Sequence, residues 1–190
     1  MKKPVTVVIS GSFRKYMDDI RNLIIDLQSR GIKVLKPDLR PTVENKDKPE
    51  FIIFSGEEGV HPWKLETDYF DAVEKCDAHI VFNPNSYLGQ SAEMELGTRL
   101  HGVEYTTGKN KGKKPIYLLE KPDHEKWIKE ARKFADVDAN KEYDIKFFCD
   151  FLNGLIENGF IKVGLDAFYH DFGIKDHSSN MIYDEERSER

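Results

Sequence analysis

Short apolar runs alternate with amphipathic segments along most of this chain of 190 residues. The first run, VTVVIS at residues 5–10, is β-branched and nearly all apolar, which is typical of a strand buried on both faces. An amphipathic stretch follows and predicts a helix. We expect this helix to end at Gly31, because glycine commonly terminates helices. The next run, IKVLKP, completes a strand–helix–strand unit, whose crossover should be right-handed.

The alternation continues along the chain and predicts the fold class. We expect further strands at residues 77–83 and 116–120, and further helices at residues 63–76, 91–102, 127–134 and 143–156. This order is typical of an α/β protein with a doubly wound, flavodoxin-like parallel sheet and helices on both faces. The last part of the chain has no clear periodicity. We therefore expect an α/β core at residues 1–120. Residues 121–190 would form a helical or irregular C-terminal extension that packs on the core or on a partner subunit.

A long polar stretch, residues 38–62, interrupts the alternation. Its apolar segment FIIF, residues 51–54, is either a short strand or a hydrophobic plug. An insertion of this length in a compact domain is often a lid or a substrate loop. A solvent-exposed loop without such a role explains the stretch equally well, and both interpretations stay open.

Composition and charge exclude several classes of protein. With 33% charged residues and a formal net charge of -5, the chain lacks the clustered positive charge of a nucleic-acid-binding surface. No apolar run approaches the roughly 20 residues that span a membrane, and the N-terminal run is too short for a signal peptide. Cys76, Cys149 and the six histidines lack metal-binding spacing. We expect a cytoplasmic protein with buried, reduced thiols that binds no metal, membrane or nucleic acid polymer.

Two connections follow strands at the edge where such sheets bind ligands, beyond the carboxyl ends of the strands. They are SGSFRKY after the first strand and NPNSYLGQSAEMELG after the third. Neither matches G-x-G-x-x-G or a Walker loop. A classical dinucleotide or nucleoside triphosphate site is therefore not supported.

The first connection has the residue types of an anion site. Gly11 lets the backbone pass close to a ligand, and Ser12 offers a hydroxyl that can also cap the following helix. Arg14 offers a guanidinium for a phosphate or a carboxylate. An ordinary capped turn with a surface arginine explains these residues equally well.

The second connection contains two carboxylates in the first turns of a predicted helix. Gly89 and Ser91 form a second candidate cradle for an anion or a sugar, and Glu93 and Glu95 follow. Acidic residues here can simply complement the helix dipole. At about 100° per residue, the two carboxylates lie on opposite sides of the buried stripe, so either could border a ligand site.

The second connection also resembles a known family. Asparagine–proline, then YLG, one residue, a serine, three residues and ELG is similar to the catalytic loop of the nucleoside 2-deoxyribosyltransferase-like superfamily. That superfamily includes nucleoside deoxyribosyltransferases and deoxynucleoside 5′-monophosphate N-glycosidases. ISGSFR, GIKVLKP and AVEKCDAHIVFNP resemble the segments that precede this loop, so the resemblance covers roughly residues 4–120.

The resemblance implies a function and assigns roles to residues. It makes Glu95 the nucleophile and gives Glu93 no such role. The Glu95 carboxylate would attack the anomeric carbon of a nucleoside or nucleoside 5′-monophosphate, and water or a second base would resolve the glycosyl-enzyme. It implies no cofactor, a small-molecule substrate and a homo-oligomer. Residues from both connections would bind the substrate: Gly11, Ser12, Phe13, Arg14, Asn83, Gly89 and Ser91.

The chain departs from the family pattern at the second polar group of the reaction, which would act together with the Glu95 nucleophile. Family members often carry an aspartate or a histidine eight residues before the aspartate that opens the third strand. Here that position is Tyr69, and Asp68 and Asp71 are one and two positions away. Tyr69 or Asp68 could fill the catalytic role, and Tyr69 could also be a plain core aromatic.

The leading hypothesis is therefore an enzyme acting on N-glycosidic bonds, either a hydrolase or a transferase. A second hypothesis is a non-catalytic nucleotide-binding module, because the usual aspartate is missing. A third is an NAD-cleaving glycohydrolase, since related α/β folds also use a single glutamate.

Overall fold

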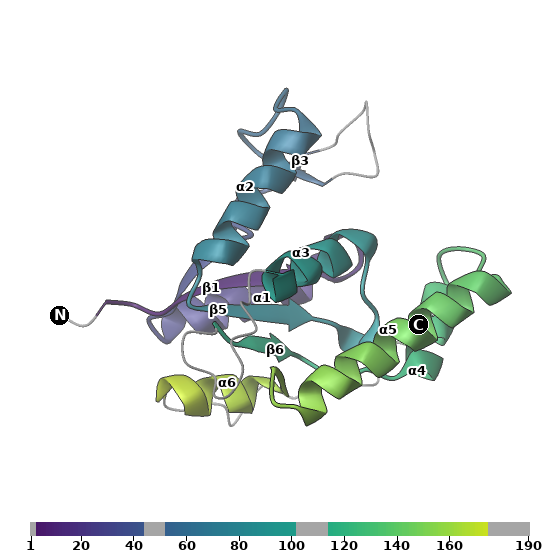
Figure 1. Ribbon diagram of the computed structural model, residues 1–190. Helices are drawn as coiled ribbons and strands as arrows, with labels where there is room; N and C mark the ends of the chain where they lie inside the picture. Colours follow the sequence, from purple (N-terminus) through teal and green to yellow (C-terminus); the bar gives the residue numbers. More distant parts are fainter. Residues whose placement is uncertain (1–2, 44–51, 102–113, 175–190) are drawn as a thin grey trace.

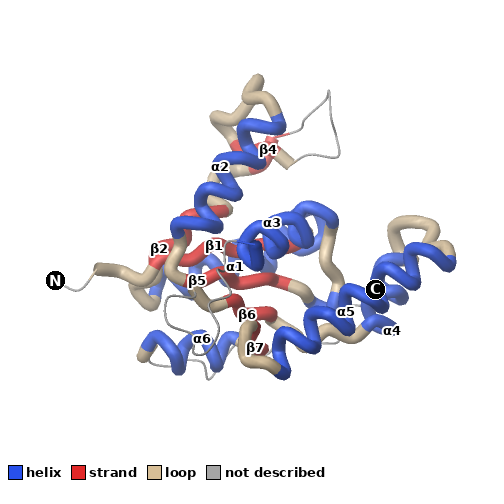
Figure 2. Tube along the Cα trace, in the orientation of Figure 1, coloured by secondary structure: helices blue, strands red, loops and turns tan. Residues whose placement is uncertain are grey.

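The computed structural model describes residues 3–43, 52–101 and 114–174. Within these ranges the main sheet has five parallel strands in the order β2-β1-β5-β6-β7, which lie side by side in Figure 2. The strands are β1 (Thr6–Gly11), β2 (Lys33–Lys36), β5 (Ala78–Phe82), β6 (Ile116–Leu118) and β7 (Ile161–Val163). The predicted fold class, an α/β protein with a doubly wound, flavodoxin-like sheet, is confirmed.

Helices cover both faces of the sheet (Figure 1). They are α1 (Phe13–Ser29), α2 (Pro62–Lys75), α3 (Gln90–His101), α4 (His124–Ala131), α5 (Ala139–Glu157) and α6 (Leu165–Phe172). One face packs on α1 and α6 through a core that includes Ile9, Phe82 and Phe168. On the other face, α2 packs on Val8, and Val81 joins a core shared with α3, α4 and α5. Strands buried on both faces explain the continuous apolar runs of the sequence.

The ends of β1 and β5 are level with each other. Ser10 pairs with Val81 and Gly11 pairs with Phe82 in parallel register. The chain leaves these two strands toward opposite halves of the sheet, because β2 lies beyond β1 and β6 lies beyond β5. Ligands of doubly wound folds bind at such a topological switch point. The two connections singled out in the sequence begin there.

The chain after residue 120 completes the sheet. β7 pairs with β6 in parallel register, and α6 then packs on the opposite face from α5. The apolar periodicity of the sequence did not indicate either β7 or α6. The C-terminal part thus contributes a strand to the core, in addition to the helices expected there.

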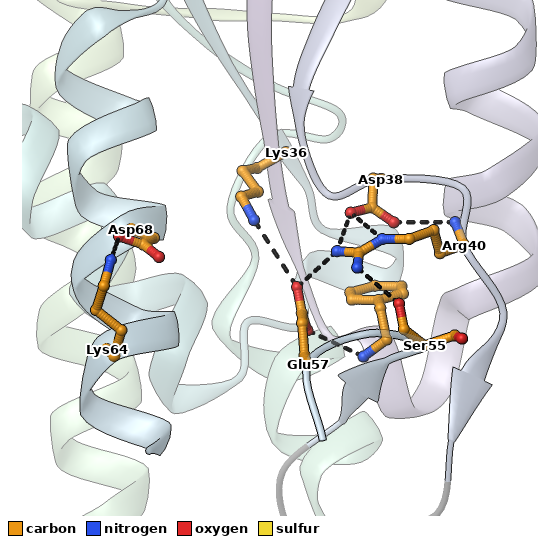
Figure 3. A network of polar contacts seen from close by, with 8 residues as sticks. Lys36, Asp38, Arg40, Ser55, Glu57, Lys64 and Asp68 are labelled. Carbon is orange, nitrogen blue, oxygen red and sulfur yellow. Dashed lines mark hydrogen bonds and ion pairs between the residues drawn. The ribbon is translucent and has the colours of Figure 1, made fainter. Parts of the chain in front are cut away.

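The polar insertion is built around a short antiparallel hairpin, β3 (Thr42–Val43) and β4 (Ile53–Phe54). β4 shows that FIIF contributes a short strand, although Phe51 lies outside the described residues. Arg40 holds the base of the hairpin (Figure 3) by donating to the Ser55 carbonyl at 2.6 Å and to Glu57 Oε1 at 2.8 Å. Helix α2 extends beyond the sheet beside this hairpin (Figure 1).

The cysteines and the lengths of the helices can be compared with the sequence predictions. Cys76 and Cys149 are buried free thiols, as expected. In the described ranges, no helix combines the length and the apolar character needed to cross a bilayer.

Candidate functional site

The structure brings the two connections into contact. A Cβ atom added at Gly89 would lie 3.7 Å from Ser12 Oγ, so the start of α3 lies against the start of α1. Gly11 also has a packing role between two strands. Its Cβ position would lie 2.9 Å from the Phe82 carbonyl oxygen, so the glycine lets β1 and β5 pass closely.

Glu95 is the most unusual polar residue at this edge. It lies on α3 and is only 3% exposed. Its Oε2 atom has no hydrogen-bond partner among the described residues. Burial raises the pKa of Glu95 to about 8, a hydrogen bond from Ser10 lowers it, and the negative charge of Glu66 raises it further. A buried carboxyl group with an unsatisfied oxygen destabilises a fold, so a functional role is the better explanation.

Ser10 and His79 lie beneath Glu95 on neighbouring strands. Ser10 Oγ and His79 Nε2 are 2.6 Å apart, and both residues are completely buried. Burial, followed by the positive charge of Arg99, lowers the pKa of His79 to about 3, so the imidazole is neutral at physiological pH. Sequence reasoning missed both residues. The available signal was a single histidine inside an otherwise apolar strand.

Of the two candidates on α2, the structure brings Tyr69 to Glu95. The Tyr69 hydroxyl donates to the Ile9 carbonyl of β1, and the ring lies 6.1 Å from that of Phe13. Burial, and then the nearby charge of Glu95, raise the pKa of Tyr69 well above its ordinary value.

Asp68 points away from this cluster. Its side chain is 42% exposed and forms an ion pair with Lys64 one turn earlier, as Figure 3 shows. The hydrogen bond from Lys64 holds the pKa of Asp68 below its ordinary value. Asp71 is likewise paired with Lys75 on the exposed side of α2.

Glu93 lies on the other side of α3, as the helical spacing predicted. Burial raises the pKa of Glu93 to about 7, and the opposing influence comes from Lys141 of α5. Glu95 instead interacts with Ser10 and Glu66, from β1 and α2. The two carboxyl groups therefore lie in different environments. Of the two, only Glu95 lies beside the Ser10–His79 pair.

The remaining predicted binding residues differ in how exposed they are and in what they contact. Arg14 and Ser91 are exposed near the starts of α1 and α3. Ser12 occupies the N-cap position of α1, but its side chain makes no capping hydrogen bond, so the predicted cap is wrong. Asn83 is buried, and its amide donates to the Glu120 carbonyl and accepts from the Glu120 N–H, each at 3.0 Å. Asn83 thus fastens the end of β5 to the end of β6.

Arg99 connects α3, which carries Glu95, to α2, which carries Tyr69. Its guanidinium is buried and donates to the carbonyl of Val73 at 2.7 Å and to that of Cys76 at 3.4 Å. These are carbonyls at the C-terminal end of α2, which lack partners within the helix. Arg99 of α3 therefore sets the position of α2.

Within residues 3–43, 52–101 and 114–174, no three His, Cys, Asp or Glu side chains are grouped as metal ligands. Comparison of the chain with known protein families, curated proteins and solved structures found no match. The chemistry of the site therefore has to be inferred from its own residues and from the sequence resemblance.

Proposed function

We propose that this protein cleaves or transfers at the N-glycosidic bond of a nucleoside or nucleoside 5′-monophosphate, with Glu95 as the nucleophile. The observation that carries the proposal is the buried Glu95 carboxyl group at the switch point, one oxygen of which lacks a hydrogen-bond partner among the described residues. The resemblance of YLGQSAEMELG to the deoxyribosyltransferase-like loop supports the same residue.

Burial suits Glu95 to this chemistry. A carboxylate with a raised pKa is more basic than usual, so its ionised form is a stronger nucleophile. A weakly solvated carboxylate also stabilises the positive charge that develops at the anomeric carbon. A Glu95 oxygen would then bond to the anomeric carbon while the N-glycosidic bond breaks, and the base would leave after taking a proton from a general acid or from water. Attack of water or of a second base on the same carbon would release the sugar, or form a new glycosidic bond, and restore the Glu95 carboxylate.

Substrate binding would use groups at the starts of α1 and α3. Ser12 and Gly89 lie against each other, and Arg14 and Ser91 are exposed nearby in sequence. We propose that these groups hold the sugar or the 5′-phosphate end, with Arg14 favouring a phosphorylated substrate. A homo-oligomeric state and a cytoplasmic location stay predictions.

The test is incubation of the purified protein with a panel of nucleosides and nucleoside monophosphates, with free base measured by chromatography. A second base added to the reaction separates transfer from hydrolysis. Release of base that is lost in Glu95→Ala supports the proposal, and an unchanged rate in that variant contradicts it. Saturable nucleotide binding without turnover would favour a binding module. Nicotinamide release from NAD would favour a glycohydrolase.

A further inference from the structure

The side chain of Lys15, in the first turn of α1, ends between two aromatic rings. Its Nζ atom lies 3.2 Å from the centre of the Tyr87 ring and 3.3 Å from the centre of the Phe134 ring. The same atom is buried and has no hydrogen-bond partner among the described residues. An ammonium group carries three N–H donors, so its burial without an acceptor needs an explanation.

The acidic residue near Lys15 is bonded to other side chains. Glu130 of α4 accepts from the Tyr16 hydroxyl at 3.2 Å through Oε1 and pairs with Lys133 Nζ at 2.9 Å through Oε2. It acts on Lys15 through its charge, without a hydrogen bond between them. The attraction at contact distance therefore comes from the negative faces of the two rings, which is a cation–π contact.

Lys15 is mainly charged at neutral pH. Burial lowers the pKa of Lys15 to about 8, the negative charge of Glu130 raises it, and the positive charge of Lys133 lowers it. At pH 7 the ammonium form thus outnumbers the neutral amine about tenfold. The other ionisable groups around the rings come from α1, α3, α4 and the segments beside them: Tyr16, Tyr87, Glu93, Glu130 and Lys133.

The cation–π contact joins three segments that are far apart in the sequence. Lys15 belongs to the first connection of the candidate site, and Tyr87 belongs to the second. Phe134 follows the end of α4. The Tyr87 ring also packs on Trp127 of α4, with the ring centres 6.5 Å apart. Lys15 therefore attaches the start of α1 to a ring that α4 already contacts.

Regular helix geometry does not fix the start of α1. Tyr16, directly after Lys15, has φ −125° and ψ 28°, which are not helical values. The first turn of α1 is therefore not a rigid continuation of the rest of the helix. A contact outside the helix is needed to set its position against the second connection.

We propose that Lys15 is a positioning residue whose ammonium, between Tyr87 and Phe134, holds the start of α1 against the connection that leads to Glu95. The groups aligned in this way are those at the starts of α1 and α3 that would bind the substrate. This consequence rests on the proposed function, whereas the cation–π contact itself does not.

The first test uses the wild-type protein without substrate. Side-chain protons of Lys15 that lie between two ring faces should appear upfield in the NMR spectrum. They should also show nuclear Overhauser contacts to the rings of Tyr87 and Phe134. Comparison with Lys15→Arg identifies these signals. Ordinary shifts without the ring contacts would overturn the proposal.

The second test measures the pKa of Lys15 by carbon-13 NMR of its side chain while the ring at position 87 is varied. Tyr87→Phe keeps the ring and should leave this pKa unchanged. Trifluorophenylalanine at the same position has nearly the same shape but a weaker negative face. It should lower the pKa by about one unit, a tenfold change in the protonation equilibrium, because the ring favours the charged form. An equal pKa with both rings would overturn the cation–π contact.

The third test separates substrate binding from the chemical step. Lys15→Met should raise KM about tenfold at pH 7 and leave kcat within about threefold, because Glu95 itself stays on α3. Lys15→Arg keeps a charge that stacks on rings and should restore KM. Above pH 8, KM should rise in the wild type as Lys15 loses its proton, but not in Lys15→Arg. A loss confined to kcat, or the same alkaline rise in Lys15→Arg, would contradict the positioning role.

A direct contact of Lys15 with the substrate is the competing explanation of a raised KM. Addition of a nucleoside monophosphate should leave the upfield Lys15 signals in place. Their return to ordinary shifts would make Lys15 a substrate ligand and overturn the proposal. Because the first two tests need no substrate, they can fail while base release succeeds, and they can succeed in a protein that releases no base.

Discussion

Arg99 on α3 donates a hydrogen bond of 2.7 Å to the backbone carbonyl of Val73 near the end of α2. One buried guanidinium thus joins the helix that carries Glu95 to the helix that carries Tyr69. The spacing between the proposed nucleophile and its aromatic neighbour therefore depends on a residue whose hydrogen bonds go to backbone carbonyls at the end of α2.

Replacement of this arginine should destabilise the fold. We expect Arg99→Met to lower the free energy of unfolding by about 2–3 kcal/mol, because the α2 carbonyls lose a buried donor. Urea denaturation measures the change. The matched control is Arg132→Met, which removes an exposed ion pair with Glu142 and should cost less than about 1 kcal/mol. Equal effects of the two substitutions would contradict the assigned role.

The two carboxylates of α3 provide a matched pair for activity. Glu95→Gln should lower the rate of base release at least about a thousandfold, because an amide cannot form the glycosyl ester. Glu93→Gln should stay within about threefold of wild type, since Glu93 faces α5 rather than the Ser10 cluster. The rates are compared at one saturating substrate concentration. A larger loss in Glu93→Gln would reverse the assignment.

The raised pKa of Glu95 predicts how stability depends on pH. Between about pH 4.5 and 8, the folded protein retains a proton on Glu95 that the unfolded chain has lost. The stability that protonated Glu95 contributes to the fold is therefore largest at low pH and is lost as the pH rises to about 8. Glu95→Gln does not titrate, so its stability relative to wild type should increase by roughly 4 kcal/mol from pH 5 to pH 9. Urea denaturation at both pH values checks this, and a constant difference would refute it.

Two glycines should respond in opposite ways to alanine. Gly11→Ala places a Cβ 2.9 Å from the Phe82 carbonyl, so we expect a loss of about 2 kcal/mol in the free energy of unfolding. A Cβ at Gly97 would meet no described atom within 4 Å, and it would improve the helix propensity of α3. Gly97→Ala should be neutral or raise stability by up to about 1 kcal/mol. Thermal unfolding of both variants distinguishes the two cases.

The neighbours Tyr69 and Asp68 can be separated by conservative substitutions. Tyr69→Phe removes the hydroxyl that donates to Ile9, and we expect it to slow base release about tenfold by loosening α2 over Glu95. Asp68→Asn should leave the rate unchanged, because Asp68 pairs with Lys64 on the exposed side of α2. A strong loss in Asp68→Asn would restore the register-shifted aspartate as the partner of Glu95.

Much of this architecture follows from sequence patterns because it depends on local periodicity. Strands buried on both faces leave continuous apolar runs, and helix geometry alone separates Glu93 from Glu95. The contact between Ser10 and His79 depends instead on the register of β1 against β5, which no local pattern encodes. The choice of Tyr69 over Asp68 depends on how α2 is rotated on the sheet. β7 is only three residues long, too short for a periodic signal.

The position of β7 in the sheet has a consequence for biosynthesis. β6 pairs with β5 on one side and with β7 on the other, so it stays an exposed edge until residues 161–163 have left the ribosome. The nascent chain must therefore carry an incomplete sheet while α4 and α5 are being synthesised. An unpaired edge of this kind is where nascent chains associate wrongly, so chaperone dependence should be greatest just before β7 emerges.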